Sequence, residues 1–138
     1  MKHFTLSEFF RSSTAAKNGI KNEPSIDERA TIVRNINLLV DNVLDPVRDM
    51  VNTPIIITSG YRCPQVNRLV GGVDNSQHMS GCAADFHVMG FTPSMMLGVF
   101  FYILNRLEYD QLIYYRSKNI IHVSYVENCP RCEAFAME

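Results

Sequence analysis

Apolar residues recur at three- and four-residue spacing in two long stretches, and this spacing predicts two helices that each bury one stripe. The first stretch covers residues 25–50, and Pro46 is expected to bend or break its last turns. The second covers residues 92–107. It begins with Thr92, a good helix-capping residue, and Pro93 follows at the first helical position.

Two shorter helices are also expected. Thr5 and Glu8 stand three residues apart, which is the spacing of a capping box, so one helix should run from Thr5 to about Arg11. The other lies around residues 65–70, and the loop-forming sequence of residues 71–76 follows it.

Runs of β-branched or alternating apolar residues predict four strands. In chain order they cover residues 54–58, 83–88, 110–115 and 119–126. The polar turn Arg116–Lys118 joins the last two strands as a hairpin. The resulting order of helices and strands predicts an α+β fold, with helices packed on one face of a small, mostly antiparallel sheet.

Length and composition narrow the class of protein. The 138 residues, 46% hydrophobic and 20% charged, fit one folded domain with an ordinary core. A net charge of -1 offers no basic surface for a polyanion, so nucleic acid is not an expected partner. The N-terminus lacks the apolar stretch of a secretory signal, and no stretch has the length of a membrane span. We therefore expect synthesis in the cytoplasm and no membrane partner. The oligomeric state stays open, with a monomer favoured.

The four cysteines are expected to be free thiols or metal ligands, because disulfides are rare in cytosolic proteins. Cys129-Pro-Arg-Cys132 has the spacing of a metal clip or a redox pair. However, it supplies only two ligands near the chain end, and neither a second such pair nor a βαβ pattern accompanies it. We expect the pair to be dispensable.

The most specific polar motif is Ser76-Gln-His-Met-Ser-Gly-Cys-Ala-Ala-Asp85, in which small residues let the backbone close around an ion. A catalytic zinc site takes three protein ligands and leaves one position open. His78 and Asp85 supply two ligands, and His122 is the candidate third, because an imidazole inside an apolar strand needs a partner. The alternatives are a solvated His78 and a hydrogen-bonded core His122. His87, on the same strand face as Asp85, is either another ligand or only a neighbour.

Three motifs together carry a resemblance to a known family. They are Ser59-Gly-Tyr-Arg62, Ser76-x-His78-x-x-Gly81-x-Ala83-x-Asp85 and His122-Val-Ser124. In order and spacing the chain resembles the zinc-dependent cell-wall peptidases of the M15 class, which include D-alanyl-D-alanine carboxypeptidases and phage endolysins. The resemblance to the small M15A-like members runs from about Phe4 to Tyr125 and leaves residues 126–138 as a C-terminal extension of the single domain.

The resemblance implies a DD-peptidase-like zinc fold and a set of site residues. The implied zinc ligands are His78, Asp85 and His122. Arg62 is implied to face the substrate, where a planar guanidinium can hold a carboxylate or carbonyl oxygen. Ser76 and Gln77 are expected to contact the substrate beside it.

The general base is the point at which the chain departs from its relatives. Many relatives carry an acid three residues before the last zinc histidine, or just after a strand like Gln111-Leu-Ile113. Here Asn119 and Tyr115 stand at those positions, and neither is a good proton acceptor at neutral pH. Asp110 and His87 are the candidate replacements, and a glutamate at position 119 is expected to raise the rate.

The leading hypothesis is a metallopeptidase in which zinc polarises the scissile carbonyl and Arg62 helps to stabilise the oxyanion. The implied substrate is a peptidoglycan stem peptide. Because no signal sequence is evident, a phage-type lysin that reaches the wall after release is expected. A zinc-containing module that binds wall peptides without hydrolysis is the first alternative. A structural zinc protein is the second, although a structural site has no need of Arg62.

Overall fold

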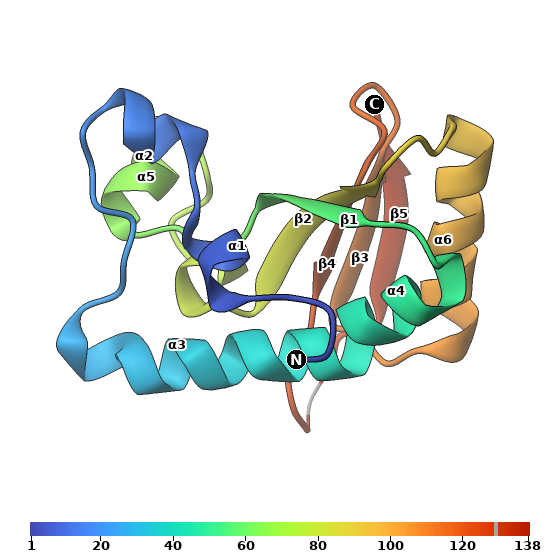
Figure 1. Ribbon diagram of the computed structural model, residues 1–138, viewed down its shortest axis with the longest axis horizontal. Helices are drawn as coiled ribbons and strands as arrows, with labels where there is room; N and C mark the ends of the chain where they lie inside the picture. Colours follow the sequence, from blue (N-terminus) through green and yellow to red (C-terminus); the bar gives the residue numbers. More distant parts are fainter. Residues whose placement is uncertain (129) are drawn as a thin grey trace.

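One five-stranded mixed sheet organises the chain, of which the computed structural model describes residues 1–128 and 130–138. The strands are β1 (Ile55–Ser59), β2 (Ala83–Val88), β3 (Gln111–Tyr115), β4 (Ile120–Ser124) and β5 (Glu133–Met137). Their order in the sheet is β1-β2-β4-β3-β5, and only the β3–β5 pair is parallel (Figure 1). The four predicted strands lie within two residues of β1 to β4.

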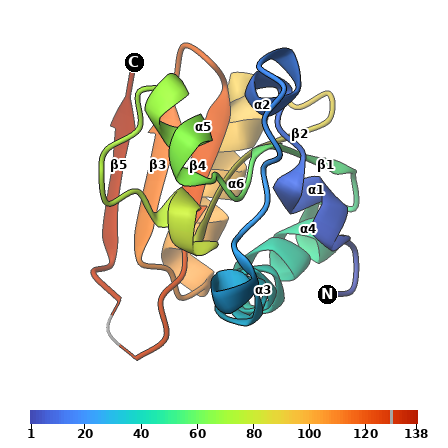
Figure 2. The ribbon, with the colours of Figure 1, turned by 90° about the vertical axis from the view of Figure 1, so that its left-hand side faces the viewer.

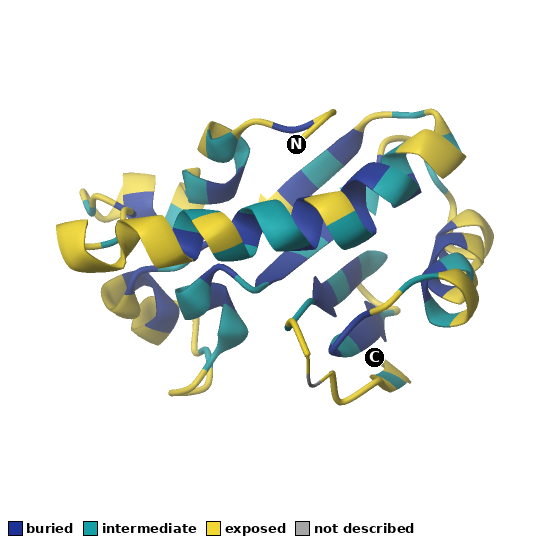
Figure 3. Ribbon diagram, turned by 90° about the horizontal axis from the view of Figure 1, so that it is seen from below, coloured by how far each residue is buried: buried dark blue, intermediate teal, exposed yellow. Residues whose placement is uncertain are grey.

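The helices are α1 (Leu6–Phe10), α2 (Ser13–Lys17), α3 (Ile26–Leu39), α4 (Asp45–Val51), α5 (Pro64–Leu69) and α6 (Pro93–Arg106), with a π turn η1 (Val40–Leu44) and a 3-10 turn η2 (Gln77–Ser80). One hydrophobic core joins α3, η1, α4 and α6 to one face of the sheet. Figure 3 shows buried and exposed residues alternating along the ribbon of α3. The predicted α+β fold, with helices on one face of a mostly antiparallel sheet, is confirmed.

Pro46 does not break the long helix. A π turn over Val40–Leu44 precedes the proline, and the helix then continues as α4 to Val51, where Asn52 adopts a left-handed conformation (Figure 1). Proline lacks an N–H donor and its ring crowds the preceding turn. A locally widened turn accommodates both effects, so the bend or break expected at Pro46 takes the form of a π bulge, beyond which the helix continues.

Two elements escape the sequence patterns. Helix α2 spans only five residues and is capped by Ser12, whose hydroxyl accepts a hydrogen bond from the Ala15 amide at 3.1 Å. Strand β5 has the sequence Glu-Ala-Phe-Ala-Met, which contains no β-branched residue, and it is largely exposed. Figure 2 shows β5 beside β3 at the edge of the sheet. Residues expected to form only a C-terminal extension thus supply the last strand of the sheet.

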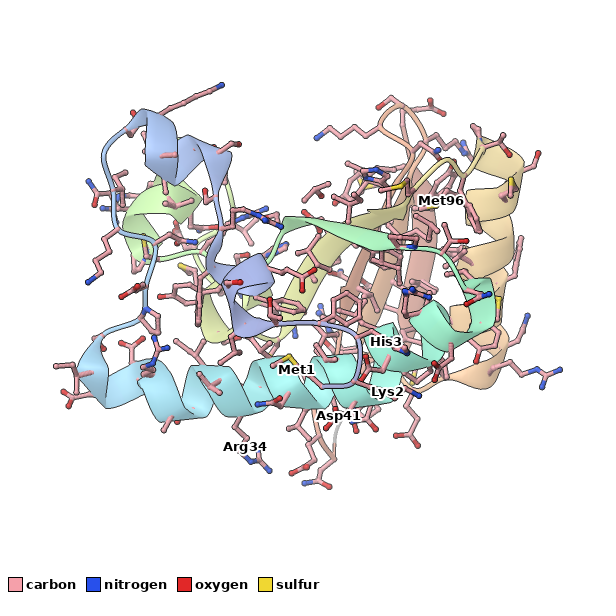
Figure 4. The ribbon with its side chains drawn as sticks, in the orientation of Figure 1. Met1, Lys2, His3, Arg34, Asp41 and Met96 are labelled. Carbon is pink, nitrogen blue, oxygen red and sulfur yellow. The ribbon has the colours of Figure 1, made fainter. Side chains whose placement is uncertain are left out.

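The residues before α1 bind to the continuous helix formed by α3, η1 and α4. The backbone amides of Lys2 and His3 donate to the buried carboxylate of Asp45, at 2.7 and 3.1 Å. The terminal amine lies 3.3 Å from Asp41, and Figure 4 shows this segment beside the helix. Helix α1, placed in this way, packs against β1 close to the residues described next.

Candidate metal centre

The polar residues of the three motifs converge at one end of the sheet. The last residues of β1 and β4 and the first residues of β2, β3 and β5 lie together there, as the strand registers require. Asp85 of β2 faces Ser59 on one side and His122 on the other. This end of the sheet therefore collects side chains from segments that are distant in sequence.

Alternation along the strands places Asp85 and His122 on the face of the sheet opposite α3, α4 and α6. Their neighbours Ala84 and Phe86 in β2, and Ile121 and Val123 in β4, are buried in the core. Because successive side chains point to opposite faces, the polar pair points away from the core.

His78 is brought to this pair by the tight turn η2. The Ser76 hydroxyl accepts a hydrogen bond from the His78 amide, and Gly81 ends the turn at φ 78°. A Cβ at Gly81 would lie 2.8 Å from the Ile32 carbonyl oxygen of α3, so only glycine fits both the conformation and the packing. The packing of the turn against α3 therefore requires the glycine of this motif.

The imidazole of His78 is oriented by the first motif. Its Nδ1 donates to the Gly60 carbonyl oxygen at 2.8 Å, which leaves Nε2 free to act as a ligand. A Cβ at Gly60 would approach the Phe9 carbonyl oxygen to 2.6 Å, and that oxygen also accepts the Tyr61 amide at 2.7 Å. The close contact with α1 therefore fixes the carbonyl that selects the His78 tautomer.

The three candidate ligands fit a divalent metal. Their ligand atoms all lie within 4.8 Å of one another. Oδ1 of Asp85 is 3.3 Å from Nε2 of His78 and 2.8 Å from Nδ1 of His122. Ligand atoms in a tetrahedral zinc site with bonds near 2.0–2.1 Å are about 3.3 Å apart. Because Nδ1 of His78 is bonded to the Gly60 carbonyl, Nε2 is the ring nitrogen that faces Asp85 and can bind the ion.

The charge state of Asp85 also suits a ligand. Burial alone would raise its pKa, but the hydrogen bonds from His122 and then His78, together with their charges, hold the pKa well below its usual range. The carboxylate therefore stays ionised at neutral pH, as metal binding requires.

Arg62 lies beside Asp85. Its Nη2 is 3.6 Å from Oδ2 of Asp85, its Nε donates to the Ser59 hydroxyl at 3.1 Å, and its Nη1 donates to Asn67 at 3.4 Å. Burial lowers the pKa of Arg62 from its ordinary value, and the charge of Asp85 opposes this effect. The guanidinium is thus held at the ligand cluster.

Two buried asparagines that no sequence pattern identified support this arrangement. Asn22 donates to the carbonyl oxygens of Phe10 and Tyr61 at 2.9 Å and accepts the Cys63 amide at 2.8 Å. Asn67 donates to the Val73 carbonyl at 2.9 Å. Neither asparagine belongs to an apolar periodic pattern, so nothing in the sequence marks either one as buried.

A cavity of about 580 Å³ opens beside the ligand cluster. Its walls include Arg62, Ser76, Gln77, Tyr115 and Arg131, together with the three candidate ligands. The loop over residues 71–76 forms one side of the cavity. The expected substrate residues Arg62, Ser76 and Gln77 therefore line one cavity with the ligands.

The two candidate bases lie outside this cavity. His87 is on the same strand face as Asp85, two residues further on and opposite Ile56 of β1, and it is not part of the ligand cluster. Asp110 is only 3% exposed and accepts hydrogen bonds from Gln77 and Arg131. Burial raises its pKa, but the hydrogen bonds from Arg131 outweigh this effect and lower the pKa. Neither side chain lines the cavity, so the role of a base stays a prediction for both.

The two positions where relatives carry an acid differ from each other. Asn119 adopts a left-handed conformation at φ 53°, accepts the Tyr114 hydroxyl at 2.8 Å and donates to the Phe91 carbonyl at 3.0 Å. Its side chain completes a turn, so a base at position 119 does not follow from this geometry. Tyr115 lines the cavity, and burial raises the pKa of its phenol.

Cys129 lies outside the described residues, and Cys132 is exposed and bonds to no other described cysteine. Neither a metal clip nor a redox pair is therefore tested by this structure. Among the described residues, none of the helices is long and apolar enough to cross a membrane.

Comparison with known proteins agrees with the geometry. No curated protein matches the chain. The family described as Peptidase M15 matches residues 2–124, which include all three motifs and every cavity residue named above except Arg131. That match covers most of the 138 residues, and the chain therefore belongs to the peptidase M15 family.

Proposed function

We propose that this protein is a zinc-dependent peptidase that hydrolyses peptidoglycan stem peptides. The observation that carries the proposal is the cluster of His78, Asp85 and His122 at the wall of a cavity, in a chain of the M15 family. His78 through Nε2, Asp85 through a carboxylate oxygen and His122 through a ring nitrogen would hold the ion. Zinc, when bound, supplies a Lewis acid that polarises a carbonyl and makes water a nucleophile at neutral pH.

The protein side chains supply orientation and charge. The Gly60 carbonyl holds the His78 ring, and Asp85 carries the negative charge that a divalent ion needs. Arg62, anchored by Ser59 and Asn67, offers its guanidinium to the carbonyl oxygen or carboxylate of a bound peptide. Ser76 and Gln77 line the same cavity and would contact the peptide beside it.

A binding module without hydrolysis is the second candidate. One observation favours it: no acidic side chain other than the candidate ligand Asp85 lines the cavity, among the residues that the structure describes. Tyr115, where an acid is common, is a poor base because its pKa is raised further.

Digestion of purified peptidoglycan, with mass analysis of the released fragments, separates the two functions. The zinc-loaded protein is expected to release peptide fragments, and both chelation and His122→Ala are expected to abolish release. Tight binding of wall peptides without any released fragment would favour the binding module instead. The fragment masses would also identify the bond, and thereby distinguish a carboxypeptidase from an endopeptidase of a phage-type lysin.

A further inference from the structure

The cavity has a wall that comes from outside the part matched by the family. Arg131 stands just before β5, beyond the matched residues 2–124, and it lines the same cavity as His78, Asp85 and His122. The pairing of β5 with β3 brings it there, and the Glu133 amide donates to the Asp110 carbonyl at 3.0 Å to begin that pairing.

A buried carboxylate fixes the Arg131 side chain. Nε and Nη2 of Arg131 donate to Oδ2 of Asp110 at 3.0 and 2.8 Å, and its backbone amide donates to Oδ1 at 2.7 Å. Asp110 is 3% exposed, so its surroundings hold it firmly. A guanidinium held in this way loses little side-chain entropy when it binds a ligand.

Gln77 ties the same group to the metal turn. Its Nε2 donates to Asp110 at 2.9 Å, and its Oε1 accepts from Nη2 of Arg131 at 3.0 Å. Because Gln77 directly precedes His78, the guanidinium has a defined position relative to the ligand cluster.

One side of the Arg131 guanidinium remains available. Among the described residues, Nη1 has no hydrogen-bond partner in the protein, and the side chain is 51% exposed although it lines the cavity. Asp110 neutralises one edge of the fork and orients it. Nη1 is left as a charge-assisted donor for an anion.

The sheet order separates Arg131 from Arg62. Arg62 follows β1 and Arg131 precedes β5, and these strands are the two edges of the sheet. Asp85 and His122 stand on β2 and β4 between those edges. The cavity therefore has a guanidinium on each side of the candidate metal ligands.

We propose that Arg131 is a second substrate-binding group, which holds a carboxylate of the peptide on the side of the metal opposite Arg62. This proposal rests on the proposed function and deepens it, because it defines the substrate as a peptide with a carboxylate away from the scissile bond. The charged residues that line the cavity are Arg62, Arg131 and Asp85, so a bound divalent ion leaves the cavity positive. Glu133, which is exposed and accepts the Gln111 amide at 2.6 Å, is the opposing charge at the rim.

The test combines a change in the protein with a change in the peptide. The peptides are synthetic stem peptides. In one series all carboxylates are free, and in the others a single carboxylate is converted to its amide. Binding to the zinc-loaded protein is measured by calorimetry, and hydrolysis is measured in parallel as kcat and KM. For one carboxylate, amidation is expected to weaken binding to the wild type about tenfold or more, since hydrogen bonds to charged groups are the strong ones. In Arg131→Gln that difference should disappear.

Two further variants keep the test interpretable. Arg131→Gln leaves Asp110 buried without its partner, so Asp110→Asn combined with Arg131→Gln removes both charges. This double variant is expected to fold, to keep its zinc affinity and to lose the preference for the free carboxylate. Arg116→Gln is the matched control, because it removes an ion pair with Glu138 at the other end of β5 and should leave the preference intact.

The outcomes distinguish a failure of the Arg131 proposal from a failure of the proposed hydrolysis. If the wild type binds the peptides but cleaves none, hydrolysis fails while the amide comparison still tests the subsite. If amidation of every carboxylate has the same effect on the wild type and on the Arg131 variants, the proposal is overturned. Loss of zinc affinity in the double variant would likewise overturn it, because Arg131 would then act by positioning the His78 turn.

Discussion

Asp85 and His122 are direct partners across strands β2 and β4, and Oδ1 of Asp85 lies 2.8 Å from Nδ1 of His122. The positions of two of the three candidate ligands are therefore determined by the register of the two strands. A slip of one residue would turn one of them into the core. The third, His78, is set independently by its hydrogen bond to Gly60.

The first prediction concerns the metal. The protein is expected to bind one zinc ion per chain, and His122→Ala should weaken that binding by more than the 10- to 100-fold that loss of an outer hydrogen-bond partner typically costs. His87→Ala, on the same sheet face, is the control and should keep full occupancy. Metal analysis after dialysis decides the question. Full occupancy in His122→Ala would show that another group is the third ligand.

The second prediction concerns Gly60. In Gly60→Ala the new Cβ would lie 2.6 Å from the Phe9 carbonyl oxygen, so α1 or the loop must move and the carbonyl that orients His78 moves with it. Both the melting temperature and the zinc affinity should fall. Gly98→Ala is the control, because its Cβ meets nothing within 4 Å and it lies in helix α6. That change should stabilise the protein by up to about 1 kcal/mol. Unchanged zinc affinity in Gly60→Ala would show that the Gly60 carbonyl does not tune the site.

The third prediction concerns the cysteine pair. Cys129→Ser combined with Cys132→Ser should leave zinc content and melting temperature nearly unchanged, because Cys132 is exposed and neither residue is needed to explain the ligand cluster. Calorimetric unfolding and metal analysis of the double variant check this. A loss of several kcal/mol, the scale of a structural metal or disulfide, would contradict it.

The fourth prediction concerns acid stability. The pKa of Asp110 is lower in the folded protein than its usual value near 3.9, because hydrogen bonds from Arg131 outweigh the effect of burial. The stability that this carboxylate contributes is therefore complete well above pH 4 and is lost as the pH falls below it.

Asp110→Asn should consequently be less stable than the wild type at pH 7 by about 1–3 kcal/mol. The difference should shrink as the pH approaches 3. Urea unfolding of both zinc-free proteins across this range measures it. A constant difference at every pH would mean that ionisation of Asp110 is not linked to folding.

The sequence predicts the fold and the ligand motifs well because both depend on local pattern. Helical spacing and strand alternation identify α3, α6 and β1 to β4, and the two glycines of the motifs are explained by contacts of a few ångströms. Strand β5 is missed because its own sequence, Glu-Ala-Phe-Ala-Met, contains no β-branched residue and is weakly strand-forming. The contact between Asp110 and Arg131 is also not evident from the sequence, because it forms only when β5 is paired with β3.

The last prediction concerns the missing base. Tyr115 lines the cavity, and the charges of Asp85 and Arg62 both act on its phenol. In Tyr115→Glu a carboxylate would stand in the cavity beside the ligand cluster, where it could accept a proton from water. General-base catalysis typically contributes about 10²- to 10⁴-fold, so kcat for stem-peptide hydrolysis should rise measurably. Tyr115→Gln is the matched control, because glutamine has nearly the same size as glutamate but does not accept a proton at neutral pH.

Asn119→Glu should behave differently. Asn119 donates to the Phe91 carbonyl and accepts from Tyr114, and a glutamate cannot make the first of these bonds. This variant should therefore lose stability without any gain in rate. If Tyr115→Glu is no faster than Tyr115→Gln while Asn119→Glu is faster than the wild type, the base position is 119 after all and the turn must rearrange. If all of them bind wall peptides equally and cleave none, the cavity serves binding alone.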